Sequence, residues 1–274
     1  MSKPLCLVTA PVATRSGYGA HARDICRALI KLDKYDVKIW SVRWGNTPMN
    51  ALNQQDPNDK MIIDRLLPNP QLPKQPDIHF HIVIPNEFNP LAKFNIGITA
   101  GLEMTACPPV WLEGMNRMDM NIVPSNFVKD TMTKIVYDIN DEKTKQKKGE
   151  LRNTKPIEVL FEGTDTSIFK KTNEFSESFL KEMKKVKESF NFLYVGHWLQ
   201  GDLGKDRKDT GMLLKVFLET FKNMKSKPGL IMKTSGAGFS VLDREQMLGK
   251  IKSIKSMIKG DLPNVYLLHG DFTD

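Results

Sequence analysis

The sequence predicts an α/β protein with two parallel sheets, and three observations carry this prediction. Short apolar runs that can form buried strands alternate with stretches that repeat apolar residues every three or four positions. Glycine-rich or polar loops follow several of these runs. The chain has 274 residues, enough for two domains, which we expect to cover 1–170 and 171–274.

The amino-acid composition indicates a folded protein and limits the kinds of partner to be expected. Apolar residues make up 40% of the chain, which is enough for real cores, and the formal net charge is +8. The charge is compatible with nucleic acid, with a phosphorylated small substrate or with an anionic surface as partner. The densest basic stretch, 143–155, is expected to be a solvated loop.

The cysteines and the hydropathy pattern predict the compartment. Cys6, Cys26 and Cys107 are far apart and offer no metal-ligand spacing, which favours a reducing environment. No apolar run is long enough for a membrane span, and the first residues do not resemble a signal peptide. We therefore expect a soluble, cytoplasmic protein without a bound metal.

The first half of the chain opens with the order strand, glycine loop, helix, strand, which is typical of a parallel sheet. A buried strand is predicted at 5–10, a helix with Ala22, Cys26 and Leu29 on its apolar face, and a second strand at 37–42. Residues 44–76, rich in Asn, Pro and Gln, are expected to wind outside the sheet. Further strands are predicted at 78–84, 95–100, 120–124 and 157–161.

The first loop contains Gly17 and Gly19 in a G-x-G-x-x-A pattern. A dinucleotide fingerprint needs its first glycine at the strand end and a carboxylate at the end of the next strand. Here a loop separates Ala10 from Gly17, and the strand VKIWSV ends without a carboxylate. Two interpretations remain: a flexible turn into the helix, or a close approach of the backbone to a bound ligand.

The strand IHFHIVI carries His79 and His81, whose side chains point to the same face because side chains alternate along a strand. A metal site would need a third ligand, and none is near in the sequence. We expect a surface pair or a pair that faces the active site.

Polar side chains follow the ends of several predicted strands. Carboxyl ends of parallel strands are where such sheets bind ligands, so these residues are site candidates. As caps and turn residues they would instead have a purely structural role, with Ser125 as the N-cap of the helix NFVKDTMTKIV. The candidates are Glu103, Ser125, Glu162 and Asp165.

The second half contains the best candidate for a phosphate site, at 192–217. A buried strand is predicted at 192–195, followed by a glycine-rich loop that ends in Arg207 and Lys208 and by a helix at 209–225. The backbone N–H groups and dipole of a helix N-terminus favour a phosphate, and fixed cations add to the attraction.

The rest of the second half continues the same rhythm. A Lys/Glu-rich helix in SESFLKEMKKVKESF is expected to connect the halves, and strands are predicted at 229–233 and 264–268. A helix at 243–259 would begin at Asp243, which resembles the cap of a capping box. Three strands leave sheet faces bare, so we expect either a C-terminally truncated domain or a partner that covers the exposed edge.

The stretch PNEFNPLAKFNIGITAGLEMTACPPVWLEGMNRMD resembles a phage and marine microbial subgroup of the GT-B glycosyltransferases of the broad family 4 (group 1), and four other stretches resemble that family as a whole. They are the loop at Gly17 and Gly19, IVPSNFVKD, VLFEGTDTSIF and VGHWLQGDLGKDRKDTGMLLKVF. The resemblance implies two Rossmann-like domains, an acceptor-side one and a donor-side one that is incomplete. It also implies retaining transfer of a sugar from a nucleotide-diphosphate donor, with no metal and no other cofactor.

The resemblance further implies roles for individual residues. Lys208 is similar to the family lysine that holds the donor diphosphate, and Arg207 could replace the family arginine, whose position holds His197. Gly17 and Gly19 would approach the diphosphate across a cleft between the domains. The family's catalytic-region histidine has no clear match. Glu103 stands at its position, with His81 or His79 as alternatives, and the family's E-x7-E segment is not present.

Two other functions stay open. The chain could be a non-catalytic or partner-dependent fragment of such an enzyme, or a basic nucleic-acid-binding protein. The scattered cations, without interleaved aromatic residues at 143–155, disfavour nucleic-acid binding. The acceptor of the sugar could be a glycan, a lipid, a protein or DNA.

Overall fold

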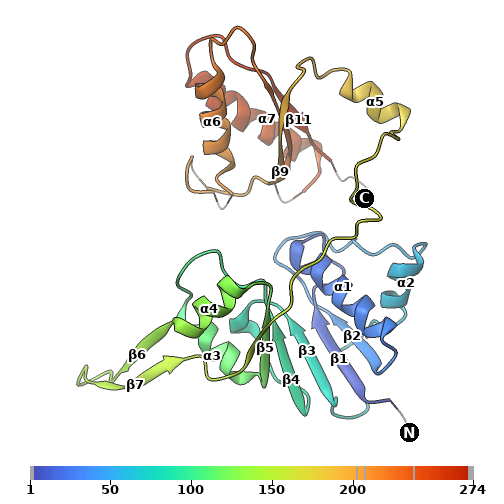
Figure 1. The fold of residues 1–274 in the computed structure, drawn as a ribbon, viewed down its shortest axis with the longest axis vertical. Coiled ribbons are helices and arrows are strands. Elements are labelled where there is room, and N and C mark those ends of the chain that lie inside the picture. Colours follow the sequence, from blue (N-terminus) through green and yellow to red (C-terminus); the bar gives the residue numbers. More distant parts are fainter. Residues whose placement is uncertain (1–2, 202, 207, 237, 271–274) are drawn as a thin grey trace. The chain divides into compact units, whose positions relative to one another are not determined.

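The computed structural model describes the chain except for residues 1–2, 202, 207, 237 and 271–274. The chain divides into two compact units, Met1–Gly163 and Thr164–Asp274. Both units are built on parallel sheets, so the predicted α/β class with two parallel sheets is confirmed (Figure 1).

The first unit contains a parallel sheet in the order β2-β1-β3-β4-β5-β8. The helix α1 packs on one face of this sheet, and α3 and α4 pack on the other. All the strands predicted for this half are present. They are β1 (Leu5–Ala10), β2 (Asp36–Ser41), β3 (Ile78–Ile82), β4 (Phe94–Ile98), β5 (Met120–Val123) and β8 (Ile157–Val159). The helices are α1 (Gly17–Lys31), α2 (Pro57–Ile63), α3 (Pro109–Arg117) and α4 (Asn126–Lys134), with a 3-10 turn, η1 (Pro85–Glu87).

The core of the first unit explains why β1 is apolar at every position. One face of the strand, with Cys6 and Val8, packs together with Ala22 and Cys26 of α1. A second cluster, built around Phe88 and the helices α3 and α4, covers part of the other face of the sheet. A central strand that is covered on both faces is expected to be continuously hydrophobic.

Two segments of the first unit differ from the sequence-based expectation. The stretch 44–76 contains α2, and its Leu66 forms a bridge with Ile39 of β2, so it does not lie wholly outside the sheet. The basic stretch 143–155 is not a loop. It belongs to an antiparallel hairpin of β6 (Val136–Asn140) and β7 (Lys147–Arg152), in which opposite charges form pairs along the strands.

The second unit contains a parallel sheet in the order β11-β10-β9. Its strands, β9 (Asn191–His197), β10 (Gly229–Ser235) and β11 (Val265–Leu268), agree with the prediction. The helices α6 (Thr210–Phe221) and α7 (Val241–Ser256) pack on one face, where Leu214 and Ile251 meet Leu230 and Met232 of β10. The connecting helix α5 (Glu177–Met183) is shorter than predicted.

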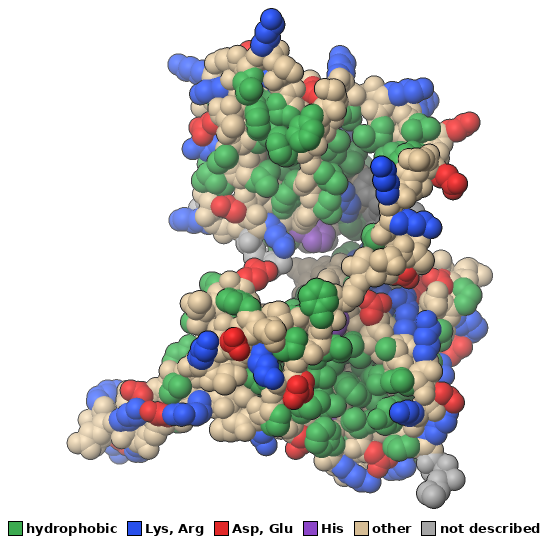
Figure 2. All heavy atoms as spheres, in the orientation of Figure 1, with side chains coloured by type: hydrophobic (Ala, Val, Ile, Leu, Met, Phe, Trp, Pro, Cys, Tyr) green, Lys and Arg blue, Asp and Glu red, His purple; other side chains and the backbone are tan. Residues whose placement is uncertain are grey.

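The prediction that the strand at 192–195 is buried is wrong. Leu193 and Val195 are 67% and 65% exposed, and Phe192 is also exposed. The reason is that α6 and α7 cover the face to which Tyr194 points, whereas Leu193 and Val195 point to the other face. In addition, β9 is an edge strand that pairs only with β10 among the described strands. Figure 2 shows hydrophobic side chains gathered on the surface of the second unit over this region.

Candidate functional site

In the first unit, the loop between β1 and α1 is held by the side chains around it. Ser16 is the N-cap of α1, and its hydroxyl accepts the backbone N–H of Gly19 at 2.9 Å. The guanidinium of Arg23 donates to the carbonyls of Val12 and Thr14, both at 3.0 Å. The loop is therefore fixed at the carboxyl end of β1, where parallel sheets bind ligands.

The two glycines of this loop have different roles. A Cβ on Gly19 would lie 2.3 Å from the backbone oxygen of Thr14, so Gly19 is required by packing. Its N–H is already bonded to Ser16, so it cannot be donated to a ligand. A Cβ on Gly17 would meet nothing within 4 Å. No hydrogen bond joins the backbone N–H of Gly17 or Tyr18 to another described residue, and these two amides are open to an acceptor.

Tyr18 connects the start of α1 to the end of β4, a contact that the sequence did not suggest. Its hydroxyl lies 2.8 Å from that of Thr99 and accepts the N–H of Ala100 at 3.1 Å. Its ring stacks on Trp44 with centroids 4.1 Å apart. Burial raises the pKa of Tyr18, and the nearby charge of Glu162 adds to the rise. Tyr18 thus stays a neutral hydroxyl.

Glu162 is the candidate carboxylate that the structure brings to the first helix. Its Oε1 lies 3.8 Å from Nδ1 of His21, one turn after the glycine loop. Glu103 lies in the loop after β4, exposed and without an ion pair or hydrogen bond to any residue that the structure describes. A carboxylate without a partner is free to accept a proton from a ligand, or a hydrogen bond from a hydroxyl group of a ligand.

Two other candidates from the sequence have structural contacts. Ser125 is the N-cap of α4 and accepts the N–H of Val128 at 3.3 Å, as the helix-cap interpretation predicted. Asp165 belongs to the second unit, where its carboxylate accepts the N–H and the hydroxyl of Ser167 at 2.8 and 2.6 Å. Both side chains shape the backbone locally, and a role toward a ligand stays a prediction.

The expectation that the histidine pair lies on the surface is wrong, and the alternative that it faces a site stays a prediction. His79 and His81 do share one face of β3, with ring centroids 5.2 Å apart, but both are buried. His79 is hydrogen-bonded to the hydroxyl of Thr9 at 2.9 Å, and His81 accepts the N–H of Asn89 at 3.1 Å. Burial lowers the pKa of His79 to about 3 and that of His81 to about 4. The catalytic role of His81 stays a prediction.

In the second unit, the predicted phosphate site at the start of α6 is already occupied by a side chain. The carboxylate of Asp206 accepts the N–H groups of Lys208, Thr210 and Gly211 at 3.2, 3.0 and 3.3 Å. Asp209, the formal N-cap, has a left-handed backbone and makes no side-chain cap bond, because Asp206 does this instead. The amides of Thr210 and Gly211 at the start of α6 are therefore not available to a phosphate.

Lys208 remains a candidate for binding the donor diphosphate, through its side chain alone. The ammonium group is exposed and has no ion pair or hydrogen bond with the rest of the described chain. Its partner in the prediction, Arg207, lies outside the described residues. A free ammonium at the carboxyl end of β9 can neutralise an anionic ligand by its own charge.

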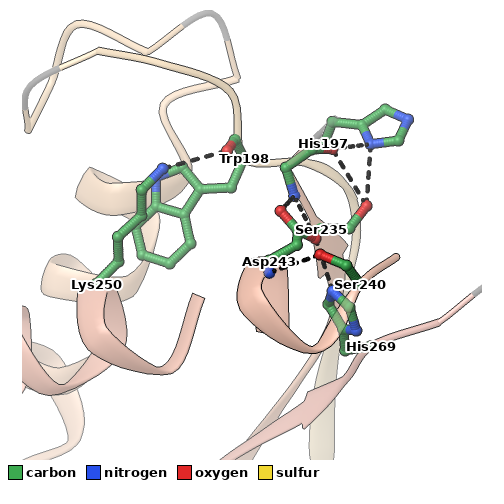
Figure 3. A network of polar contacts seen from close by, with 8 residues as sticks. His197, Trp198, Ser235, Ser240, Asp243, Lys250 and His269 are labelled. Atoms are coloured by element: carbon green, nitrogen blue, oxygen red, sulfur yellow. Dashed lines mark hydrogen bonds and ion pairs between the residues drawn. The ribbon is translucent and has the colours of Figure 1, made fainter. Parts of the chain in front are cut away.

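His197, the other departure from the family pattern, is held by the end of β10. Its Nδ1 lies 3.2 Å from the hydroxyl of Ser235 and 3.1 Å from the carbonyl oxygen of Gly236. Since a carbonyl can only accept, Nδ1 carries the hydrogen and Nε2 is left as the free nitrogen. Figure 3 shows the ring directed away from the Asp243 cluster. His197 can therefore offer Nε2 to a ligand.

Asp243 does not have the predicted capping role. The N-cap of α7 is Ser240, whose hydroxyl accepts the N–H of Asp243 at 3.1 Å. The Asp243 carboxylate instead accepts the N–H of Gly236 at 3.0 and 3.1 Å and pairs with Nε2 of His269 at 2.7 Å (Figure 3). It thus fixes the loop after β10 to the ends of α7 and β11.

Lys250 of α7 holds the start of the loop after β9. Its ammonium donates to the carbonyls of Trp198 and Leu199, both at 3.3 Å, and lies 5.1 Å from the Trp198 ring centroid. Burial lowers the pKa of Lys250, against the charges of Asp206 and Asp243. The sequence did not single out Lys250 or His269, because each acts through a contact between distant segments.

The part of the chain that the structure describes contains neither a metal-ligand cluster nor a membrane-spanning helix. No three His, Cys, Asp or Glu side chains gather as ligands for a metal there. Over the same residues, no helix is both long and apolar enough to pass through a membrane.

The fold is shared with solved glycosyltransferase structures. A structure of trehalose-6-phosphate synthase, OtsA, is 16% identical, covers 99% of this chain and 74% of its own, and has a TM-score of 0.51. An apo structure of OtsA is 15% identical, with the same coverage and TM-score. No family profile and no curated protein sequence matches the chain. At this identity the likeness shows the fold, which is the predicted GT-B glycosyltransferase fold.

Proposed function

We propose that the chain is a glycosyltransferase of the family 4 type, which transfers a sugar from a nucleotide-diphosphate donor with retention of configuration. The observation that carries the proposal is the free Lys208 ammonium at the carboxyl end of β9, in a chain with the GT-B fold. The donor is the substrate, so the proposal requires no metal and no other cofactor. We place the reaction in the cytoplasm.

Lys208 would act on the leaving group. When the bond between the sugar and the diphosphate breaks, negative charge grows on the diphosphate oxygens. A fixed ammonium stabilises that charge more in the transition state than in the ground state, which is how such groups accelerate a reaction. The Nε2 atom of His197, at the end of β9, can accept a hydrogen bond from a hydroxyl group of the donor.

Glu103 is the candidate for activating the acceptor. It is a free carboxylate after β4, on the same sheet edge as the fixed hydroxyl of Tyr18. A carboxylate at hydrogen-bond distance from an acceptor hydroxyl can orient it and take up its proton. The open amides of Gly17 and Tyr18 could bind an oxygen of either substrate.

The proposal is tested by titrating the protein calorimetrically with nucleotide-diphosphate sugars and with the corresponding nucleoside diphosphates. Binding of both, with competition between them, is the expected result. Absence of binding at millimolar donor would contradict donor recognition by this chain.

The free edge of β9 favours one second candidate, a unit that needs a partner to be active. Leu193 and Val195 expose apolar surface beside unpaired backbone groups, and an edge of this kind invites pairing with another strand. The test is sedimentation of wild type and of Val195→Lys. A self-associating wild type and a monomeric variant support partner dependence, and two identical monomers contradict it.

A further inference from the structure

The first unit contains an open pocket that the functional candidates above do not use. It has a volume of about 530 Å³ and lies between α4, the first residues of the β6–β7 hairpin and the loop that follows Glu103. Figure 1 shows this hairpin beside α4. The volume is within the range of small-molecule sites. The residues that matter for its chemistry are Thr105, Ala106, Phe127, Asp130, Lys134 and Val136.

One part of the lining is apolar. Phe127, in the first turn of α4, is 51% exposed, and Val136 at the start of β6 is 44% exposed. Ala106 completes this part of the lining. A half-exposed aromatic ring in a hollow can pack its face against the C–H groups of a ligand.

The polar part of the lining is unpaired. Asp130 and Lys134 are four residues apart on α4 and therefore lie on the same side of the helix. Within the described chain, neither has an ion pair or hydrogen bond, and the hydroxyl of Thr105 has none either. The pocket thus offers a carboxylate that accepts, an ammonium that donates and a hydroxyl that does both.

The charges around the pocket disfavour a phosphate ligand. Asp130 cancels the charge of Lys134 within the pocket. Two lysines of the adjacent hairpin are already paired, Lys147 with Asp138 at 2.6 Å and Lys148 with Asp141 at 2.5 Å. A nucleic-acid site instead needs an excess of unpaired cations.

We propose that this pocket binds a neutral saccharide, as the part of the acceptor that positions it near Glu103. The inference rests on the proposed function and narrows its acceptor from glycan, lipid, protein or DNA to a glycan. A sugar ring presents C–H groups to Phe127, while its hydroxyls donate to Asp130 and accept from Lys134.

The test is ligand-observed NMR of the whole chain with cellobiose, maltotriose and N,N′-diacetylchitobiose, and with a dT oligonucleotide for comparison. The variants are Phe127→Ala and Asp130→Asn, with Phe179→Ala as the control because it removes an exposed ring of α5 in the other unit. Phe127 is half exposed, so its truncation leaves no internal cavity, and circular dichroism checks the fold.

The expected result is that at least one saccharide binds, and that Phe127→Ala and Asp130→Asn each weaken binding about tenfold while Phe179→Ala does not. Saccharide binding that is absent, or equal in wild type and both pocket variants, would overturn the proposal. So would dT binding that Phe127→Ala weakens. Nucleoside diphosphate binding is measured on the same samples. Its absence with saccharide binding intact contradicts the proposed donor function alone.

Discussion

The carboxylate of Asp206 accepts the backbone N–H of Thr210 at 3.0 Å and so occupies the N-terminus of α6. The loop before this helix was expected to bind phosphate through the helix amides and through its cations. Because Asp206 takes the amides of Thr210 and Gly211, recognition of an anion at this loop depends mainly on the Lys208 side chain. The negative charge of the Asp206 carboxylate also repels an anion at this loop, and so weakens the attraction between the Lys208 ammonium and a phosphate.

Replacement of Asp206 by Ala should destabilise the second unit. Three buried or half-buried N–H groups would lose their acceptor, at a cost of about 1–3 kcal/mol in the free energy of unfolding. Urea denaturation followed by circular dichroism measures it. Asp209→Asn is the matched control: its side chain makes no cap bond, and Asn tolerates its backbone angle of φ 52°, so the midpoint should not move. Equal losses in both variants would show that Asp206 is not the cap.

The two glycines of the first loop should respond in opposite ways to Ala. Gly19→Ala forces a Cβ to within 2.3 Å of the Thr14 backbone oxygen, and we expect a loss of about 1–3 kcal/mol or more. Gly17→Ala has open space and starts a helix, so stability should stay equal or rise by roughly 0.5 kcal/mol. Thermal unfolding compares them. A destabilised Gly17→Ala with an unchanged Gly19→Ala would contradict the loop geometry.

Stability should fall on mild acidification because of the buried histidines. Their pKa values in the folded protein, about 3 and about 4, lie below the unfolded value near 6.5, so the unfolded chain binds protons first. The free energy of unfolding should therefore decrease as pH falls below about 6.5, by roughly 1.4 kcal/mol per pH unit for each histidine. Above about pH 6.5 both histidines are neutral in the folded and the unfolded chain, so the free energy of unfolding no longer depends on their protonation.

Urea midpoints at several pH values between neutral and mildly acidic provide the measurement. His79→Gln and His81→Gln should each reduce the slope, whereas His21→Gln leaves both buried histidines in place and should retain it. A slope that is unchanged in the two buried-site variants would show that other groups cause the acid sensitivity.

The sequence was sufficient for the strands of the two parallel sheets, since buried strands such as LCLVTA are continuous apolar runs. The sequence-based prediction failed where contacts between distant segments of the chain determine the local structure. Opposite charges across the β6–β7 hairpin, as in Lys147 and Asp138, turned an apparent basic loop into paired strands. The exposure of Leu193 follows from its place on the uncovered face of the edge strand β9, which its apolar run does not reveal.

The candidate site was predictable in the same partial way. Lys208 and Glu103 are exposed in the loops that follow β9 and β4, as the position of each after a strand suggested. The cap role of Asp206 and the pair of Asp243 with His269 depend on backbone turns, which bring the carboxylates to particular amides. A local pattern assigned Asp243 to a helix cap and gave Asp206 no role, because a sequence shows which residues can accept a hydrogen bond but not which donor reaches them.

Donor binding by a matched pair of lysine variants tests the central claim most directly. Lys208→Ala removes the ammonium at the start of α6, and Lys222→Ala removes one at the other end of the same helix, so both change the net charge equally. Calorimetric titration with a nucleoside diphosphate should show binding weakened about tenfold or more in Lys208→Ala and unchanged in Lys222→Ala. Equal affinity in Lys208→Ala and the wild type would contradict the assignment of this loop as the diphosphate site.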